Sequence, residues 1–425
     1  MKEQKIIHVP RRFVSHEWGG TETVILEISK QQRALGMNPQ IMTSMALAES
    51  GCDHETIQDI EVHRFPHLYP FWGLADADRA AMDKKGGNLF SWSLFRALCQ
   101  EADVRLYHAH ALKRLGGMVR TAARWNGKPY VVSLHGGIFD VPAAELADLT
   151  KPIQGKWEWG KPLGALLGAR RVLEDADHVI CVGESESLKA RQQLSHDRVS
   201  YLPNGVDASR FATGDGRAFR EKWGISADAF LVVNMGRIDS QKNQLGLVRG
   251  FARFRASVPE AQLLLIGPVT QPAYLQQIRQ LIASEGLEQS VQIIPGLENG
   301  SQDLVDAYHA ADVFVLASRH EPFGIVVLEA WCAGCAVIVS RVGGLQSLVR
   351  DGETGIFFDP DAADADEQLA MALKSLQENE QKRRFMGQAG RREAIENYEW
   401  SRITQRLELI YQQAEAHAKK RKEGG

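Results

Sequence analysis

The sequence alternates short apolar runs, rich in β-branched residues, with longer segments of helical periodicity, and it does so in two consecutive series. The first series begins with the run at 5–9 and ends near residue 205. The second begins with the apolar run at 229–238 and ends with a short one at 355–360. Strands that alternate with helices are typical of βαβ units and of parallel sheets. The chain is therefore expected to be an α/β protein with two open parallel sheets.

The same patterns predict where the elements lie. Strands are expected at 5–9, 39–44, 103–110, 129–136, 178–183, 199–205, 229–238, 261–267, 291–296, 312–318, 336–340 and 355–360. Helices are expected at 21–36, 114–126, 243–257, 272–285, 301–310 and 322–333. The tail from 366 to 420 is helical by pattern, with an interruption near Tyr398-Glu399-Trp400.

The length of the chain predicts more than one domain. A chain of 425 residues exceeds what a single core usually organises. The turn-forming Pro203-Asn204-Gly205 separates the two series. We predict one domain over residues 1–204, a second over 205–390, and a C-terminal segment over 391–425 that ends in a basic tail.

The composition excludes several classes of protein. A formal net charge of -3 argues against nucleic-acid binding. Five cysteines in so long a chain do not form a disulfide framework and suit a reducing compartment. No window reaches the ~18 apolar residues of a membrane span, and the first apolar run is too short for a signal peptide. We expect a cytoplasmic protein, and peripheral contact with the inner membrane face stays open.

The segment Glu321-Pro322-Phe323-Gly324-Ile325-Val326 follows an expected strand and is the strongest motif. Pro322 suits the first turn of a helix. The amides of residues 323–326 would then be unpaired donors, which bind phosphate. Glu321 and Glu329 could each hold a diol of one long ligand, because a carboxylate accepts two hydrogen bonds. The alternative is a helix cap with a surface glutamate.

Two further segments stand at expected strand ends. After the first strand of the second series come Gly236, Arg237 and Lys242. The side chains of Arg237 and Lys242 are cationic and could bind a diphosphate. After the first strand of the chain, Gly19-Gly20 lets a ligand approach the backbone. The alternatives are a turn with solvated charges and a plain tight turn.

Histidines form the last group of candidates. His135 ends the strand at 129–136 and could hydrogen-bond a sugar hydroxyl, although a structural role is the alternative. His108 and His110 alternate along a strand, a spacing that is compatible with a metal. No carboxylate or cysteine cluster accompanies them, so packing is the preferred interpretation.

As a set, these segments resemble the retaining GT-B glycosyltransferases of family 4. The shared motifs are E-P-F-G-I-V-x-x-E, G-R-x-x-x-x-K, the N-terminal G-G and the strand-end His-Gly, with further matches at 176–180, 203–207, 343–344 and 351–355. The similarity covers nearly the whole chain, in the same order. It implies two Rossmann-like domains whose parallel sheets face each other across a cleft, with a C-terminal helix that crosses back to domain one.

The resemblance also implies roles for single residues. Glu329 would bind the nucleotide ribose, Glu321 the donor sugar, Arg237 and Lys242 the diphosphate, and His135 would reach the donor sugar. The donor-binding set is completed by Gly19, Gly20, Phe323, Gly324, Ile325 and Val326. Domain one would carry the acceptor and domain two the nucleotide sugar. No metal or other cofactor is expected, since the two cations and the helix dipole take that role.

A few positions depart from the family pattern. Gly137 stands where an acid is common, Gln346 and Ser347 replace a Pro-Glu pair, and Asn243 replaces a glycine after the lysine. These departures bear on the identity of the donor sugar more than on the reaction.

The expected reaction moves a hexosyl unit from a UDP- or GDP-sugar to an acceptor hydroxyl, with retention, in the synthesis of a glycan, glycolipid or cell-surface polysaccharide. A GT-B sugar-nucleotide epimerase or hydrolase is one alternative, and a non-catalytic nucleotide-sugar-binding subunit is another. An NAD-dependent oxidoreductase is disfavoured, because no G-x-G-x-x-G follows either first strand.

The acceptor is expected on domain one, as a sugar, a lipid-linked molecule or another small molecule. Three aromatic segments could stack on a sugar or touch a membrane: 69–72, 90–95 and 157–159. Packing in the core is the alternative for all three. The sequence does not indicate an oligomeric state.

Overall fold

The computed structural model describes residues 4–49, 51–84, 86–136, 139, 150–298 and 300–423. Its contacts divide the chain into two compact units. Unit 1 comprises Met1–Pro203 and Trp400–Gly425, and unit 2 comprises Asn204–Glu399. The C-terminal segment was expected to leave the second domain at residue 391. Instead, helix α16 (Glu380–Asn397) packs on elements of unit 2 to its end, and α17 (Trp400–Glu423) starts after the turn at Tyr398-Glu399.

Unit 1 is built on a mostly parallel sheet that has eight strands among the described residues, in the order β10-β9-β7-β6-β1-β2-β4-β3. The strands are β1 (Lys5–Val9), β2 (Asn38–Ser44), β3 (His54–Ile57), β4 (Ile60–Phe65), β6 (Val104–Ala109), β7 (Tyr130–Leu134), β9 (His178–Cys181) and β10 (Val199–Tyr201). The central strands are almost entirely buried, as parallel strands covered by helices on both faces must be.

Two strands of this sheet were not expected from the sequence. β3 and β4 form an antiparallel hairpin at the sheet edge. Its turn residues, Gln58 and Asp59, both have positive φ, 45° and 66°, which is the geometry of a type I′ turn. The expected strict alternation of strand and helix therefore fails at this edge.

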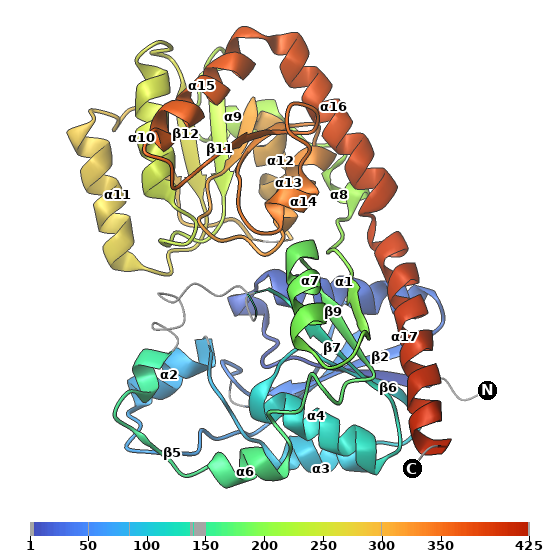
Figure 1. Ribbon diagram of the computed structural model, residues 1–425. Coiled ribbons are helices and arrows are strands. Elements are labelled where there is room, and N and C mark those ends of the chain that lie inside the picture. The colour runs from blue at the N-terminus through green and yellow to red at the C-terminus, as the bar shows by residue number, and fades with distance from the viewer. Residues whose placement is uncertain are drawn as a thin grey trace. The chain divides into compact units, whose positions relative to one another are not determined.

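Helices α1 (Gly20–Ala34), α4 (Lys113–Trp125), α7 (Glu184–Gln193) and α17 pack against the sheet of unit 1. Figure 1 shows α17, in red, running along this sheet. Asp177, which is fully buried, holds the helix there. Its carboxylate accepts hydrogen bonds from the Tyr130 amide at 3.0 Å and from Arg421 at 2.5 Å. The C-terminal helix is thus part of unit 1.

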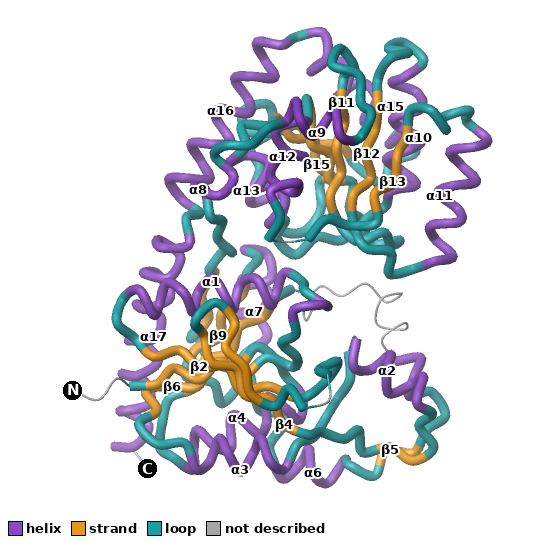
Figure 2. The backbone as a smooth tube through the Cα atoms, turned by 180° about the vertical axis from the view of Figure 1, so that it is seen from behind, coloured by secondary structure: helices purple, strands orange, loops and turns teal. Residues whose placement is uncertain are grey.

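Unit 2 is built on a parallel sheet that has six strands in the part of the chain described, in the order β13-β12-β11-β14-β15-β16. The strands are β11 (Leu231–Met235), β12 (Gln262–Ile266), β13 (Val291–Ile294), β14 (Val313–Leu316), β15 (Ala336–Ser340) and β16 (Ile356–Phe358). In Figure 2, helices α10 (Gln244–Arg255), α11 (Pro272–Ser284) and α15 (Ala365–Glu378) cover one face, and α12 (Gln302–Ala310) and α13 (Ile325–Cys332) the other. The expected α/β class, with two Rossmann-like sheets, is confirmed.

Each sheet has one point where the direction of strand addition reverses. In unit 1 it lies between β1 and β6, and in unit 2 between β11 and β14. Ligands of open α/β sheets bind outside the carboxyl ends of the strands at such points. The loops that follow these strands are therefore the first places to look for a site. No helix among the described residues has the length and apolar character to cross a bilayer.

Candidate functional site

The switch point of unit 2 brings two of the sequence motifs together. The loop after β11 carries Lys242, and the loop after β14 carries Glu321. Lys242 Nζ donates to Glu321 Oε2 at 2.6 Å, and the side chains are 14% and 10% exposed. Ser318 Oγ donates to the same carboxylate oxygen at 3.2 Å. The cation expected at the diphosphate and the acid expected at the sugar are thus direct partners, a contact that local sequence patterns do not indicate.

Arg237 lies on the same loop and keeps a more open position. Its guanidinium is 3.3 Å from an oxygen of Asp239 and 3.2 Å from Oε1 of Gln241, and its side chain is 42% exposed. Gln241 in turn donates to the backbone carbonyl of His320 at 3.0 Å. The loops after β11 and β14 are therefore tied by the Lys242–Glu321 ion pair and by several hydrogen bonds, this one among them.

Asn243 occupies a backbone conformation that explains its residue type. Its φ of 56° and ψ of 39° lie in the left-handed region, which glycine and asparagine adopt most readily. Its side chain donates to the Ala317 carbonyl at 3.1 Å, at the end of β14. The departure from the family glycine at this position is therefore compatible with the same turn.

The helix after Glu321 starts later than expected. α13 begins at Ile325, and its N-cap Gly324 has a φ of 99°, which no right-handed helix contains. Pro322 is thus outside the helix, and the expected helix over 322–333 was wrong at its start. The amides of residues 323–326 have no hydrogen-bond acceptor among the described residues, while Val327 donates to the Gly324 carbonyl at 2.9 Å. The free donors expected at this helix start are present.

Gly343 and Gly344 support the segment that carries Glu321. The Gly344 amide donates to the Glu321 carbonyl at 2.8 Å. A Cβ at Gly344 would lie 2.1 Å from the Pro322 oxygen, and one at Gly343 would lie 2.3 Å from the Glu321 oxygen. Only glycine fits such close approach of two backbones. The shape of the loop after β14 therefore depends on these two glycines.

Glu329 lies on α13 and has a partner that the sequence did not reveal. Tyr308, a buried residue of α12, donates its hydroxyl to Glu329 Oε2 at 2.6 Å. Burial raises the pKa of Glu329, and the Tyr308 hydrogen bond opposes that rise. Nothing in the local pattern around Tyr308 marks it, since it comes from a different helix.

In unit 1, Gly19 and Gly20 lie at the start of α1. Gly19 is the N-cap and Gly20 the first helical residue. The first turn of α1 contains Glu22, which is buried and has an oxygen 3.3 Å from Nε of Arg12. Desolvation raises the pKa of Glu22 above its usual value, and the positive charge of Arg12 partly offsets that rise. The Arg12–Glu22 pair beside the glycines was not expected from the sequence.

His135 follows β7 and is half-buried. Its Nε2 lies 2.8 Å from Nδ1 of His110, which follows β6. Burial lowers the pKa of His135 to about 4. Gly137, one of the departures from the family pattern, falls outside the described residues.

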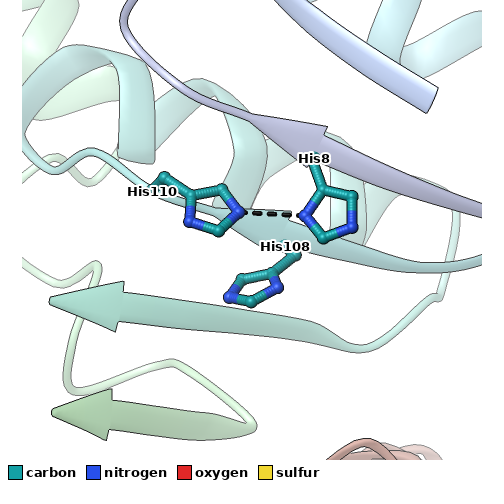
Figure 3. A group of neighbouring side chains, drawn as sticks. All are labelled: His8, His108 and His110. Atoms are coloured by element: carbon teal, nitrogen blue, oxygen red, sulfur yellow. Dashed lines mark hydrogen bonds between the residues drawn. The ribbon is translucent and has the colours of Figure 1, made fainter. Parts of the chain in front are cut away.

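His8, His108 and His110 offer three ring nitrogens within 4.8 Å of one another, a spacing within the reach of a metal ion (Figure 3). His8 lies on β1 and the other two come from β6 and its end. All three are buried. These nitrogens also have hydrogen-bond partners within the protein, which compete with a metal ion.

The three aromatic segments lie together in unit 1. Strand β5 (Phe71–Trp72) pairs with β8 (Trp157–Glu158), and the register sets Trp72 opposite Trp157. These two side chains are 65% and 67% exposed. Leu68 and Phe90 form a separate β-bridge. Tyr69 and Phe71 are buried, as is Leu94, so packing holds for part of 69–72 and of 90–95, whereas Trp157 and Trp159 are both exposed.

Two family models match the chain in succession. The first is a glycosyl transferase 4-like domain, over residues 19–205, and the second is glycosyl transferases group 1, over residues 215–393. A protein of Catenulispora acidiphila named D-inositol 3-phosphate glycosyltransferase 2 is 30% identical over 354 residues, which are 79% of this chain and 77% of that protein. A D-inositol 3-phosphate glycosyltransferase of Kineococcus radiotolerans is 29% identical over 93% of this chain and 91% of that protein.

Solved structures resemble the chain over almost its full length. HepE of Anabaena, in complex with UDP and glucose, has a TM-score of 0.72 and 21% identity, over 96% of this chain and 99% of that one. Sucrose-phosphate synthase of Thermosynechococcus elongatus has a TM-score of 0.73 and 22% identity, over 97% and 99%. At such identities the likeness establishes the fold alone.

Proposed function

Because the chain belongs to the group 1 glycosyltransferases and is a nucleotide-sugar glycosyltransferase, we propose that it moves a hexosyl unit to an acceptor hydroxyl with retention. We place UDP-sugars first among the donors and GDP-sugars second. UDP leads because HepE, a fold neighbour, is solved with UDP and with UDP-glucose. The product would be a glycan, a glycolipid or a cell-surface polysaccharide.

The observation that supports this proposal most is the contact of Lys242 with Glu321 at the switch point of unit 2. A leaving diphosphate is stabilised by positive charge, and a sugar diol is bound by a carboxylate that accepts two hydrogen bonds. In a nucleotide sugar the two groups are bonded to each other, so the cation and the carboxylate must lie close together. Lys242 and Glu321 provide one of each at 2.6 Å, beside the free amides of residues 323–326. Arg237 adds a second, more exposed cation on the same loop.

We assign the remaining roles as follows. Glu329, oriented by Tyr308, binds the ribose of the nucleotide. Phe323, Gly324, Ile325 and Val326 present their amides to the sugar and the phosphates. In unit 1, Gly19 and Gly20 approach the donor with their backbone, and His135 accepts a hydrogen bond from a hydroxyl of the donor sugar. Turnover is proposed to need no metal ion, since the cations and the helix start supply the positive charge.

The reaction breaks the bond between the anomeric carbon and the β-phosphate oxygen and forms a bond from that carbon to the acceptor oxygen on the same face. The acceptor proton goes to the departing phosphate oxygen, so no side chain is needed as general base. Lys242 and Arg237 stabilise the charge on the diphosphate as it leaves. The acceptor is proposed to lie near the exposed pair Trp72 and Trp157, whose faces can stack on a sugar.

A panel of UDP-, GDP- and ADP-sugars in a thermal-shift assay tests the donor. A UDP-sugar should raise the melting temperature most, because a ligand that binds only the native state stabilises it. Product analysis then follows, with D-inositol 3-phosphate as the first acceptor, because the relatives carry its name. Turnover in EDTA should equal turnover in magnesium.

The same assays can contradict the proposal. An epimerase or hydrolase would convert the donor at full rate without any acceptor. A binding subunit would show a thermal shift and no turnover with any acceptor. Inversion at the anomeric carbon, read from the coupling constant of the product, would exclude the retaining mechanism.

A further inference from the structure

His135 is the end of a continuous chain of buried hydrogen bonds in unit 1. His135 Nε2 lies 2.8 Å from His110 Nδ1, and His110 Nε2 lies 3.0 Å from His8 Nδ1. Figure 3 shows the second of these contacts as a dashed line between the two rings. The three rings come from the ends of β7 and β6 and from β1, so the chain crosses neighbouring strands of the sheet.

The chain of hydrogen bonds continues from His8 to side chains of two helices. His8 Nε2 lies 2.9 Å from Oε1 of Gln32 on α1, and Gln32 Nε2 donates to the hydroxyl of Tyr411 on α17 at 3.2 Å. The Tyr411 hydroxyl lies 2.7 Å from His108 Nδ1, and His108 Nε2 lies 2.7 Å from Ser133 Oγ. His8, Gln32, His108 and Tyr411 are all at most 1% exposed. Water therefore has no access to the middle of the chain.

The four imidazoles are neutral at neutral pH. Burial lowers the pKa of His8 and His135 to about 4 and holds the pKa of His108 and His110 well below the usual range. A neutral imidazole has one N–H donor and one bare acceptor nitrogen. In a chain of such rings, the direction of one hydrogen bond fixes the direction of the next.

Gln32 sets that direction. Its side-chain carbonyl faces His8, so His8 Nε2 carries the proton and His8 Nδ1 is bare. His110 must then donate from Nε2 and accept at Nδ1, and His135 must donate from Nε2. On the other side, the Gln32 amide donates to Tyr411, and we assign the Tyr411 hydroxyl hydrogen to the bond with His108 Nδ1. His108 therefore also carries its proton on Nε2.

We propose that His110, His8, Gln32 and Tyr411 are positioning residues that fix His135 as its Nε2–H tautomer and leave its Nδ1 bare to accept a hydrogen bond from a donor-sugar hydroxyl. His135 Nδ1 has no hydrogen-bond partner among the described residues, so it is the nitrogen left for a ligand. The proposal rests on the proposed function in one respect, namely that His135 meets the donor sugar. The tautomer itself does not depend on that role.

A metal ion is the main rival for the three central histidines. Every ring nitrogen of His8, His108 and His110 already has a hydrogen-bond partner at 2.7–3.0 Å. A metal held by one nitrogen of each ring would break the chain and separate His135 from Gln32. The two assignments therefore predict different results from the same sample.

The tautomers can be read directly by two-bond ¹⁵N–¹H correlation spectra of the full protein with ¹⁵N-labelled histidine, assigned by single substitutions. We expect Nε2–H tautomers for His8, His108, His110 and His135. Tyr411→Phe and Gln32→Met each remove a link, and the tautomer of His135 should become mixed in both. Tyr130→Phe is the matched control, because this buried hydroxyl donates only to the Val172 carbonyl at 2.9 Å. It should leave every histidine signal unchanged.

Three results would overturn the proposal. One is an Nδ1–H tautomer at His135 in the unsubstituted protein. Another is a His135 tautomer that neither Tyr411→Phe nor Gln32→Met alters. The third is binding of added Zn²⁺ at one equivalent with loss of the Nε2–H signals of His8 and His110, which would assign a metal site instead.

Measurements of turnover test separately whether Gln32 acts through His135 and whether His135 contacts the donor sugar. With UDP-glucose, or the donor that the panel identifies, Gln32→Met should lower kcat/KM about tenfold, or about 1.4 kcal/mol. The same substitution should cost less than twofold in a His135→Ala background, because the residue acts through His135. Additive losses would contradict positioning. If His135→Ala has no effect by itself, the sugar contact fails while the tautomer result still stands.

Discussion

Lys242 Nζ and Glu321 Oε2 are 2.6 Å apart, although the two residues come from loops after different strands, β11 and β14. The direction of strand addition reverses between these two strands, and this reversal is what sets the loops side by side. A diphosphate that binds here competes with Glu321 for the Lys242 ammonium. The binding of a nucleotide and the rate of turnover should therefore both depend on that competition.

Glu321→Ala should lower turnover at least ~100-fold, which corresponds to about 3 kcal/mol of lost transition-state contacts. The substitution removes the carboxylate proposed to hold the donor sugar and leaves Lys242 without its partner. Steady-state kinetics with the accepted donor measure the effect. Glu353→Ala is the control, because Glu353 pairs with Arg350 in an exposed position. An unchanged rate in Glu321→Ala would contradict the assigned role.

Glu321→Gln should strengthen the binding of UDP while it weakens turnover. The amide keeps the shape of the side chain but removes a negative charge beside the proposed diphosphate position. We expect the dissociation constant of UDP to fall about fivefold, on the order of 1 kcal/mol. Isothermal titration calorimetry measures it, and Lys242→Met should change the constant in the opposite direction. Weaker UDP binding in Glu321→Gln would mean that the phosphates lie elsewhere.

Gly344→Ala should disturb the loop that carries Glu321. The new Cβ would lie 2.1 Å from the Pro322 oxygen, so one of the two backbones must move. We expect a loss of stability of about 1–3 kcal/mol, together with a loss of turnover. Urea unfolding and kinetics measure the two effects. Gly300→Ala is the control, since a Cβ there meets no atom within 4 Å. Equal behaviour of the two variants would show that the close approach is unimportant.

The buried histidines should make stability depend on pH below neutrality. The pKa of His8 falls from 6.5 to about 4 on folding, so the unfolded chain binds the proton more tightly. Stability is then complete above pH 6.5 and is lost as the pH falls towards 4. His8 alone contributes about 3 kcal/mol to the complete loss, of which about 2 kcal/mol is reached by pH 5. Urea midpoints at pH 7 and pH 5 measure it, and His8→Gln should show a flatter dependence. An equal slope in the variant would show that His8 does not titrate as proposed.

The sequence predicted the two sheets well, because their central strands are buried on both faces and therefore read as continuous apolar runs. The hairpin β3–β4 was missed. Its strands carry charged residues such as Glu55 and Arg64, and the buried Arg64 donates both to Glu55 and to the Phe13 carbonyl, which is far away in sequence. A local pattern does not report such a partner.

The sequence predicted which types of residue the loops of the candidate site carry, but not the contacts between them. Residue types indicated acids, cations and free amides near two strand ends. The contact between Lys242 and Glu321 spans 79 residues, and the late start of α13 depends on Gly343 and Gly344 from another loop. The bond from Tyr308 to Glu329 and the chain from His135 to Tyr411 likewise join separate elements. Distances of this kind come from the tertiary fold and have no signature in local periodicity.

The place of α17 has a consequence for how the protein is made. The sheet of unit 1 is translated before unit 2, yet its partner helix leaves the ribosome only after the whole of unit 2. Until then Gln32 and His108 lack the Tyr411 hydroxyl, and Asp177 lacks Arg421. The nascent N-terminal half must therefore wait with one face of its sheet uncovered and these polar groups open to water, while the second half can fold as soon as it emerges. Unit 1 would thus be completed only when α17 docks on its sheet.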